Sequence, residues 1–130
     1  MHDALRAALT PVLDDVCTTT LALVVEDSDW SDDVNQPSAF LRAPDGTGAG
    51  VSVWLPDPEL EQRVSVADQV QEQVVESIGG TASNWPICPE HPTTHPMTAR
   101  AVDGVACWVC PASGTPAARV GSLGSTSAAR

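Results

Sequence analysis

The sequence predicts an α+β fold, with an N-terminal α-β-β-β-α unit built on a small antiparallel sheet and a β-hairpin unit after it. Two segments carry apolar residues at helical spacing, and three short strand-like segments joined by turn sequences lie between them. The composition then changes, since six of the eleven prolines and three of the four cysteines lie beyond Gly80. We therefore expect a first domain at 1–80, a second at 81–119 and a disordered tail of small residues at 120–130.

The first predicted helix covers residues 4–16, where apolar residues recur every three or four positions. Pro11 interrupts this pattern. Either the helix bends there, or Thr10 caps a second short helix with Pro11 in its first turn. Residues 18–26 follow as a strand with aliphatic side chains on both faces, which is typical of a strand buried on both sides. Cys17, at the entrance to this strand, is expected to be a small core residue.

Two more strands are predicted at residues 39–43 and 50–55, around a turn sequence at 44–48. The second helix begins with Asp57 as its N-cap and Pro58 at its first helical position. Helical periodicity divides the rest of this segment into a buried and a solvated side. The buried positions are Leu60, Val64, Ala67, Val70, Val74 and Ile78. The solvated positions are Glu61, Gln62, Asp68, Gln69, Glu72, Gln73 and Glu76. The Gly79-Gly80 pair is expected to end the helix.

The formal net charge of −11 is unevenly distributed along the 130 residues. Residues 1–79 hold fifteen carboxylates and three arginines, whereas residues 80–130 hold two and three. This acidity argues against nucleic acid and anionic membranes as partners, and favours another protein with a basic surface. No apolar run reaches the ~18 residues of a membrane span, and the amino terminus lacks a secretory pattern. We therefore expect a cytoplasmic protein with reduced or metal-bound cysteines.

An acidic loop at residues 27–33 contains four aspartates around Trp30. Its spacing lacks the glycine and the glutamate that an EF-hand calcium loop requires, so we expect a solvated loop. If Trp30 and Trp54 are both exposed, they mark a partner site. For Trp85 and Trp108, which flank the cysteine-rich segment, we expect packing rather than recognition.

The residues that indicate chemistry lie in the second domain. Cys88 and His91 are separated by two residues, an Asp103-Gly104 hairpin turn follows, and Cys110 ends the second strand of that hairpin. A segment this short and polar cannot bury enough apolar surface to fold alone. A structural zinc ion, which prefers four thiolate and imidazole ligands, would supply the missing stabilisation.

These residues resemble the zinc-ribbon family, in which two Cys-Pro-x-Cys-Gly knuckles at the ends of a β-hairpin share one ion. Cys88-Pro-Glu-His91 looks like the first knuckle and Cys110-Pro-Ala-Ser-Gly114 looks like the second, but Ser113 stands where the second ligand of that knuckle belongs. The segment also resembles the short Trp-Pro-x-Cys-Pro-x-His … Trp-x-Cys-Pro tails of small bacterial proteins. The resemblance covers about thirty residues and implies a zinc-ribbon-like β-hairpin module, but no activity.

The fourth ligand is left open between His95 and Cys107. His95 follows His91 by four residues, so a short turn brings both to one ion. Cys107 has ligand spacing to Cys110, but residues three apart on a straight strand point to opposite faces. His95 is therefore preferred.

The expected function is that of a non-enzymatic accessory module that acts through protein–protein contact. One alternative is a zinc-dependent hydrolase with a water at an open metal position and Glu90 as its base. A second alternative is a nucleic-acid-binding zinc ribbon in the second half. Without a metal, Cys88 and Cys110 would be buried thiols or a disulfide pair.

Overall fold

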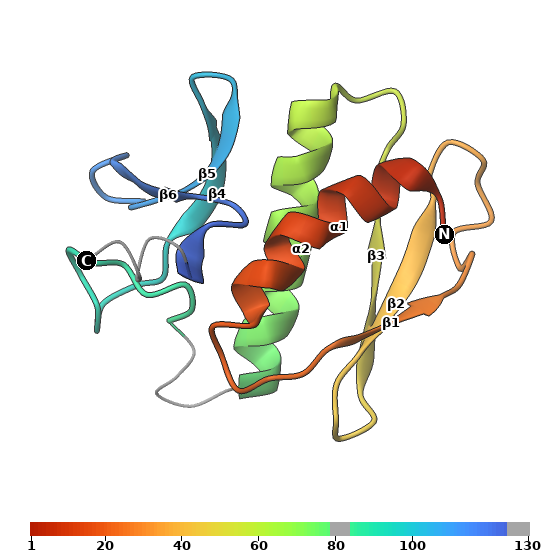
Figure 1. Cartoon of the computed structure of the whole chain (residues 1–130), viewed down its shortest axis with the longest axis horizontal. Helices are drawn as coiled ribbons and strands as arrows, with labels where there is room; N and C mark the ends of the chain where they lie inside the picture. The colour runs from red at the N-terminus through yellow and green to blue at the C-terminus, as the bar shows by residue number, and fades with distance from the viewer. Residues whose placement is uncertain (79–83, 125–130) are drawn as a thin grey trace.

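Two amphipathic helices and two small sheets make up the described part of this computed structural model, which covers residues 1–78 and 84–124. Both sheets are antiparallel and three-stranded, in the orders β1-β2-β3 and β4-β5-β6. Figure 1 shows α2 between the two sheets, with α1 crossing in front of it. The predicted α+β class is therefore confirmed.

Helix α1 spans Asp3–Val16 and is continuous through Pro11. The Thr10 hydroxyl donates back to the carbonyl of Arg6 at 2.9 Å, so Thr10 does not cap a second helix. At the start of the helix, Nδ1 of His2 accepts the amide of Ala4. Cys17 is the C-cap and is exposed, so the prediction that it is a core residue was wrong.

The first sheet consists of β1 (Val24–Asp27), β2 (Ser38–Arg42) and β3 (Gly48–Ser52). The predicted hairpin of the second and third strands is confirmed. The prediction of a first strand at 18–26 buried on both faces was wrong. It is short and lies at the edge of the sheet, and Val24 is 61% exposed because no described helix covers the outer face.

Helix α2 spans Glu59–Ile78. The amide of Gln62 donates to the carbonyl of Pro58, so Pro58 rather than Asp57 occupies the N-cap position. Val70 and Val74 are buried as predicted. Gln62 and Gln73 were predicted to face water, but both are buried. Gln62 lies against the segment that joins β3 to α2, where it donates to three backbone carbonyls, and Gln73 donates to the carbonyl of Leu41 in β2. The predicted Gly79-Gly80 stop lies outside the described residues.

The second sheet consists of β4 (Thr98–Val102), β5 (Val105–Val109) and β6 (Pro116–Arg119). Asp103 and Gly104 both adopt positive φ, at 50° and 77°, as the predicted two-residue hairpin turn requires. The third strand, β6, was not predicted. It extends the hairpin into a sheet, which differs from the isolated hairpin expected from the resemblance.

Most of the buried apolar residues of the described ranges form one cluster that includes both helices and both sheets. Trp85 and Trp108 belong to this cluster and pack edge to face, with ring centroids 5.7 Å apart, which confirms the packing prediction. Of the expected tail at 120–130, residues 120–124 are described. Val120 and Leu123 pack against the cluster.

Candidate metal centre

Three of the four candidate ligands lie on one loop, which connects α2 to β4, and the fourth follows β5. The loop is held in place at both ends. Ile87 and Pro96 form an isolated β-bridge, and the amide of Met97 donates to the carbonyl of Pro86 at 2.9 Å. Gln71 on α2 donates to the carbonyls of Trp85 and Met97 from a buried position. These contacts fold the loop back on itself and present its inner side chains to the end of β5.

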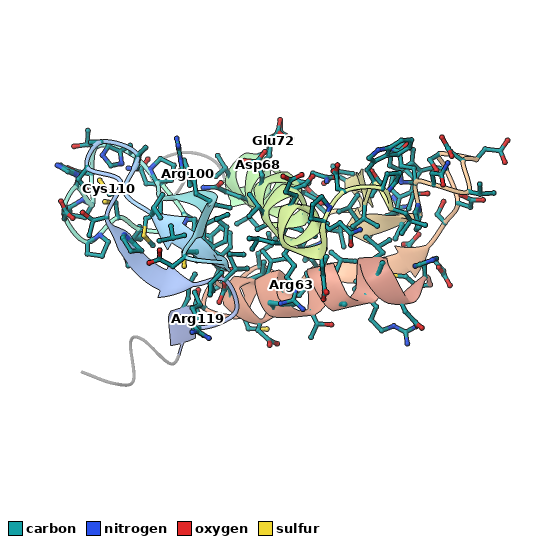
Figure 2. All side chains as sticks on the ribbon, turned by 90° about the horizontal axis from the view of Figure 1, so that it is seen from above. Arg63, Asp68, Glu72, Arg100, Cys110 and Arg119 are labelled. Carbon is teal, nitrogen blue, oxygen red and sulfur yellow. The ribbon has the colours of Figure 1, made fainter. Side chains whose placement is uncertain are left out.

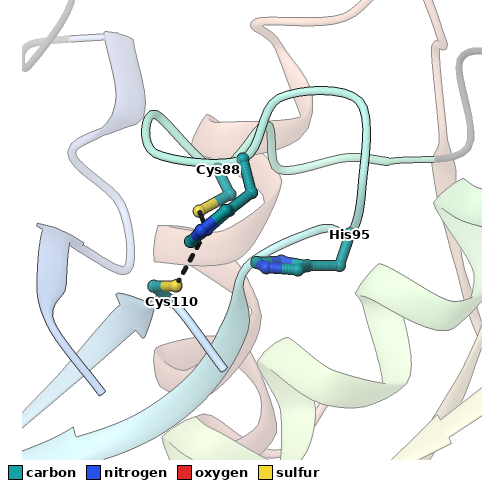
Figure 3. A group of neighbouring side chains, drawn as sticks. Cys88, His95 and Cys110 are labelled. Atoms are coloured by element: carbon teal, nitrogen blue, oxygen red, sulfur yellow. Dashed lines mark hydrogen bonds between the residues drawn. The ribbon is translucent and has the colours of Figure 1, made fainter. Parts of the chain in front are cut away.

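The structure brings together Cys88, His91, His95 and Cys110, whose ligand atoms all lie within 4.8 Å of one another. Figure 3 shows Cys88 and His95 on the loop and Cys110 at the end of its strand, all three directed to a common point. Nδ1 of His91 lies 3.8 Å from the sulfur of Cys88 and 3.5 Å from that of Cys110. Within residues 1–78 and 84–124, no other group of three or more such side chains is close enough to hold a metal ion.

The ring of His95 presents one specific nitrogen to this group. Its Nδ1 lies 3.2 Å from the carbonyl of Pro96, which favours the tautomer with the proton on Nδ1. Its Nε2 is buried and has no hydrogen-bond partner among the described residues. A buried polar atom without a partner costs free energy, and a metal ion at this point removes that cost. The Nδ1 contact is of the kind that orients a metal-binding histidine.

The two thiols of the group are both buried. The polar side chain and backbone of Ser113, with smaller effects of the Ala112 backbone and the Cys88 thiol, lower the pKa of Cys110 to about 6, against the opposing effect of burial. A thiolate is the form that binds metal. The hydroxyl of Ser113, which the resemblance places at a ligand position, donates to the hydroxyl of Thr115 at 2.9 Å.

Cys107 lies outside this group. It is paired across the second sheet with Arg100 on one side and Arg119 on the other. Burial raises the pKa of its thiol, with smaller opposing and reinforcing effects of Arg119 and Asp103. The strand alternation that argued against Cys107 therefore agrees with the observed arrangement.

The other candidates from the sequence have different surroundings. In the acidic loop, Asp27 pairs with the N-terminal amine at 2.9 Å and the carboxylate of Asp33 accepts the amide of Asn35. All four cysteines, which lie within the described ranges, are free thiols. Glu90, the base that a hydrolase would need, is exposed.

Sequence reasoning missed Asp15 and Gln71, two buried polar residues that support the second sheet and the ligand loop. Their signal was weak, because each lies in a helix where a polar residue normally faces water. Comparisons with protein-family models, with curated proteins and with solved structures found no match for this chain. In the described part of the chain, neither helix is both long and apolar enough to cross a membrane.

Proposed function

We propose that this chain is a small, acidic, non-enzymatic accessory protein that acts through contacts with other proteins. In this proposal a structural zinc ion, bound by Cys88, His91, His95 and Cys110, holds its C-terminal third in shape. The observation that carries the metal assignment is the convergence of two thiols and two imidazoles on one point. The similarity to zinc ribbons is limited to the sequence motifs around Cys88 and Cys110.

The donor set and its spacing support zinc. Zinc–sulfur bonds of about 2.3 Å and zinc–nitrogen bonds of about 2.0–2.1 Å, at tetrahedral angles, separate a sulfur from a nitrogen donor by about 3.5 Å. The two sulfur–nitrogen distances at His91 are 3.8 and 3.5 Å. Two thiolates and two imidazoles are also a common ligand set of structural zinc sites.

Four protein ligands support a structural rather than a catalytic role. A catalytic zinc site normally keeps one position for water or substrate, whereas a structural site is closed by four side chains. In this proposal His95 would occupy the position that a hydrolase would leave to water. The exposed position of Glu90 gives a metal-bound water no buried base. The hydrolase alternative is therefore less well supported.

The metal proposal is tested by measuring zinc in protein purified without added metal, by inductively coupled plasma mass spectrometry. We expect one zinc per chain in the wild type and far less than one in Cys88→Ser and His95→Ala. Cys107→Ser is the matched control, because it removes a buried thiol outside the group and should retain one zinc.

Cobalt substitution provides an independent measurement, which does not depend on how much zinc stays bound during purification. Cobalt in a tetrahedral site with two thiolates should give intense visible absorption in the wild type and in Cys107→Ser. Retention of zinc by His95→Ala with loss from Cys107→Ser would reverse the ligand assignment. Wild-type protein that neither contains nor takes up zinc or cobalt would refute the metal proposal.

A further inference from the structure

No described helix covers the outer face of the first sheet, and the loop that carries Trp30 lies over part of it. Ala39, Leu41, Val51 and Val53 point inward to the core. The cross-strand register places Glu26, Phe40 and Gly50 in one row on the opposite face. Trp30 and Trp54 remain 44% and 43% exposed. The sequence predicts a partner site here if both tryptophans are exposed, and both are exposed.

Trp30 is fixed in place on this face. Its Nε1 donates to the carbonyl of Ala39 at 2.9 Å. Its ring lies directly against Gly50, since a Cβ atom at that position would be 2.7 Å from Cε2 of Trp30. The glycine thus lets one side of the ring rest on β3 while much of the indole remains open to solvent. A rigid, half-exposed indole loses little conformational entropy when a ligand stacks on it.

The same face already holds a guanidinium group against an aromatic ring. Arg42 lies over Phe40, with Cζ 5.8 Å from the ring centroid. The Nε of Arg42 also donates to a carboxylate oxygen of Glu26 at 2.8 Å. An arginine of a partner can make the same pair of contacts, one with a ring and one with a carboxylate.

Carboxylates surround Trp30 in the sequence and are available to a partner. Asp29, Asp32 and Asp33 all lie within three residues of Trp30, and all three are exposed. None of the three forms an ion pair with a described residue. Indole faces attract cations, and the carboxylates add a negative field in the same place. Charge complementarity therefore selects a cationic occupant.

We propose that this surface binds an arginine-rich segment of a partner protein, with a guanidinium stacked on Trp30 and further arginines facing the aspartates. We call it the acidic aromatic face, and its residues are Trp30, Phe40, Asp29, Asp32 and Asp33. Arginine fits better than lysine, because a planar guanidinium stacks on an indole and still donates to carboxylates. This inference deepens and rests on the proposed role in protein contact, but not on the metal site. Cys110 lies at the opposite end of the molecule from the first sheet (Figure 2).

The test titrates the full-length, metal-loaded protein with a peptide of nine arginines and a peptide of nine lysines. Binding is followed by isothermal titration calorimetry and by tryptophan fluorescence at low and moderate salt. We expect nine arginines to bind at least threefold more tightly than nine lysines, and both affinities to fall with added salt. The Trp30→Leu variant should remove the preference for arginine while leaving the salt-dependent part of binding.

Two triple variants with equal charge changes locate the site. Asp29→Asn/Asp32→Asn/Asp33→Asn should weaken binding at least tenfold, and asparagine accepts the positive φ of 53° at position 32. The matched control is Asp68→Asn/Glu72→Gln/Glu76→Gln on the exposed side of α2. Asp68 and Glu72 project outward from that helix, on the side away from α1 (Figure 2). This control should weaken binding less than threefold.

Four outcomes would overturn the inference. Equal losses in the two triple variants would show general charge attraction without a site. Equal binding of the two peptides, unaffected by Trp30→Leu, would exclude stacking. A wild-type dimer that blocks peptide binding would place a second copy on this face. If the protein holds one zinc but binds neither peptide, only this inference is refuted. If the wild-type protein cannot hold zinc but binds the arginine peptide as described, only the metal proposal is refuted.

Discussion

Asp15 is a buried carboxylate that joins three parts of the chain. It lies in the last turn of α1 and is fully buried. Its Oδ2 accepts Nε1 of Trp108 at 2.8 Å and the amide of Gly121 at 2.6 Å, and its Oδ1 accepts the amide of Leu123 at 3.0 Å. One side chain thus fixes the central strand of the second sheet and the segment after β6 to the first helix.

Replacing Asp15 should therefore be costly. Asp15→Ala leaves three buried donors without an acceptor, and we expect it to lower the free energy of unfolding by about 3 kcal/mol. Asp15→Asn should cost about 1 kcal/mol, because an amide oxygen still accepts two of the bonds but its NH₂ faces the amide of Leu123. Urea denaturation measures both values. Asp14→Ala, at the exposed neighbouring position, is the control and should change stability by less than about 0.5 kcal/mol.

Because Asp15 is titratable, its contribution to the free energy of unfolding should depend on pH. Burial raises the pKa of Asp15 above its ordinary 3.8, while the hydrogen bonds from Trp108, Gly121 and Leu123 oppose the rise. Between the ordinary and the raised pKa, the folded protein binds a proton that the unfolded chain does not. The contribution of Asp15 to stability should therefore increase as the pH falls through that window. The difference in unfolding free energy between wild type and Asp15→Asn isolates this effect, and a difference independent of pH would contradict it.

At the scale of elements, glutamines on α2 attach the helix to strand and loop backbone on both of its sides. Gln69 exchanges hydrogen bonds with the amide and the carbonyl of Ser52 in β3. Gln73 donates to the carbonyl of Leu41 at 2.7 Å. Gln71 donates to the ligand loop on the other side. Backbone amides and carbonyls that face a buried helix need hydrogen-bond partners. The long, neutral side chain of glutamine provides such partners without burying a charge.

Gln71 therefore connects the fold to the candidate metal centre. Gln71→Met keeps the side-chain length but leaves the carbonyls of Trp85 and Met97 without this donor, so we expect a loss of about 1–3 kcal/mol of stability. Because both ends of the ligand loop lose a contact, zinc affinity should fall as well. Competition with a colorimetric chelator measures the affinity. Glu72→Met, on the exposed side of the same helix, should leave both quantities nearly unchanged, and an equal loss there would contradict the assigned role.

At the scale of the whole molecule, the candidate metal centre is continuous with the core. Cys88, Met97 and Cys110 belong to the same buried cluster as Leu9 and Val70 of the two helices. An ion bound by this centre would stabilise the folded state by mass action, and the effect would spread through the shared core.

Removal of the metal should therefore lower the stability of the entire chain. We expect a strong chelator to reduce the melting temperature while far-ultraviolet circular dichroism and tryptophan fluorescence still report one transition. The same scan tests the predicted division at residue 80. Two separate transitions, with only the second affected by chelator, would show that residues 81–119 fold as an independent domain. A melting temperature unchanged by chelator would contradict the stabilising role of the metal.

Local patterns predicted much of the fold and the composition of the site. The turn at Asp103-Gly104, the hairpin of β2 and β3 and the two amphipathic helices all follow from residue types at short spacing. The choice of His95 over Cys107 rested on strand alternation, which is also a local property. Most of the errors concern burial instead. The first strand was expected to be buried on both faces, Cys17 in the core, and Gln62 and Gln73 in water.

The sequence by itself determined where helices and turns form and which side chains offer thiol and imidazole donors, because these properties depend on neighbours a few residues apart. Only the tertiary structure decided which faces are covered, since burial depends on contacts between segments far apart in the chain. It placed α2 between two sheets, left the outer face of the first sheet without a covering helix, and joined Asp15 to Trp108, 93 residues away. No local pattern contains that information, because the partner of each buried group lies on another element.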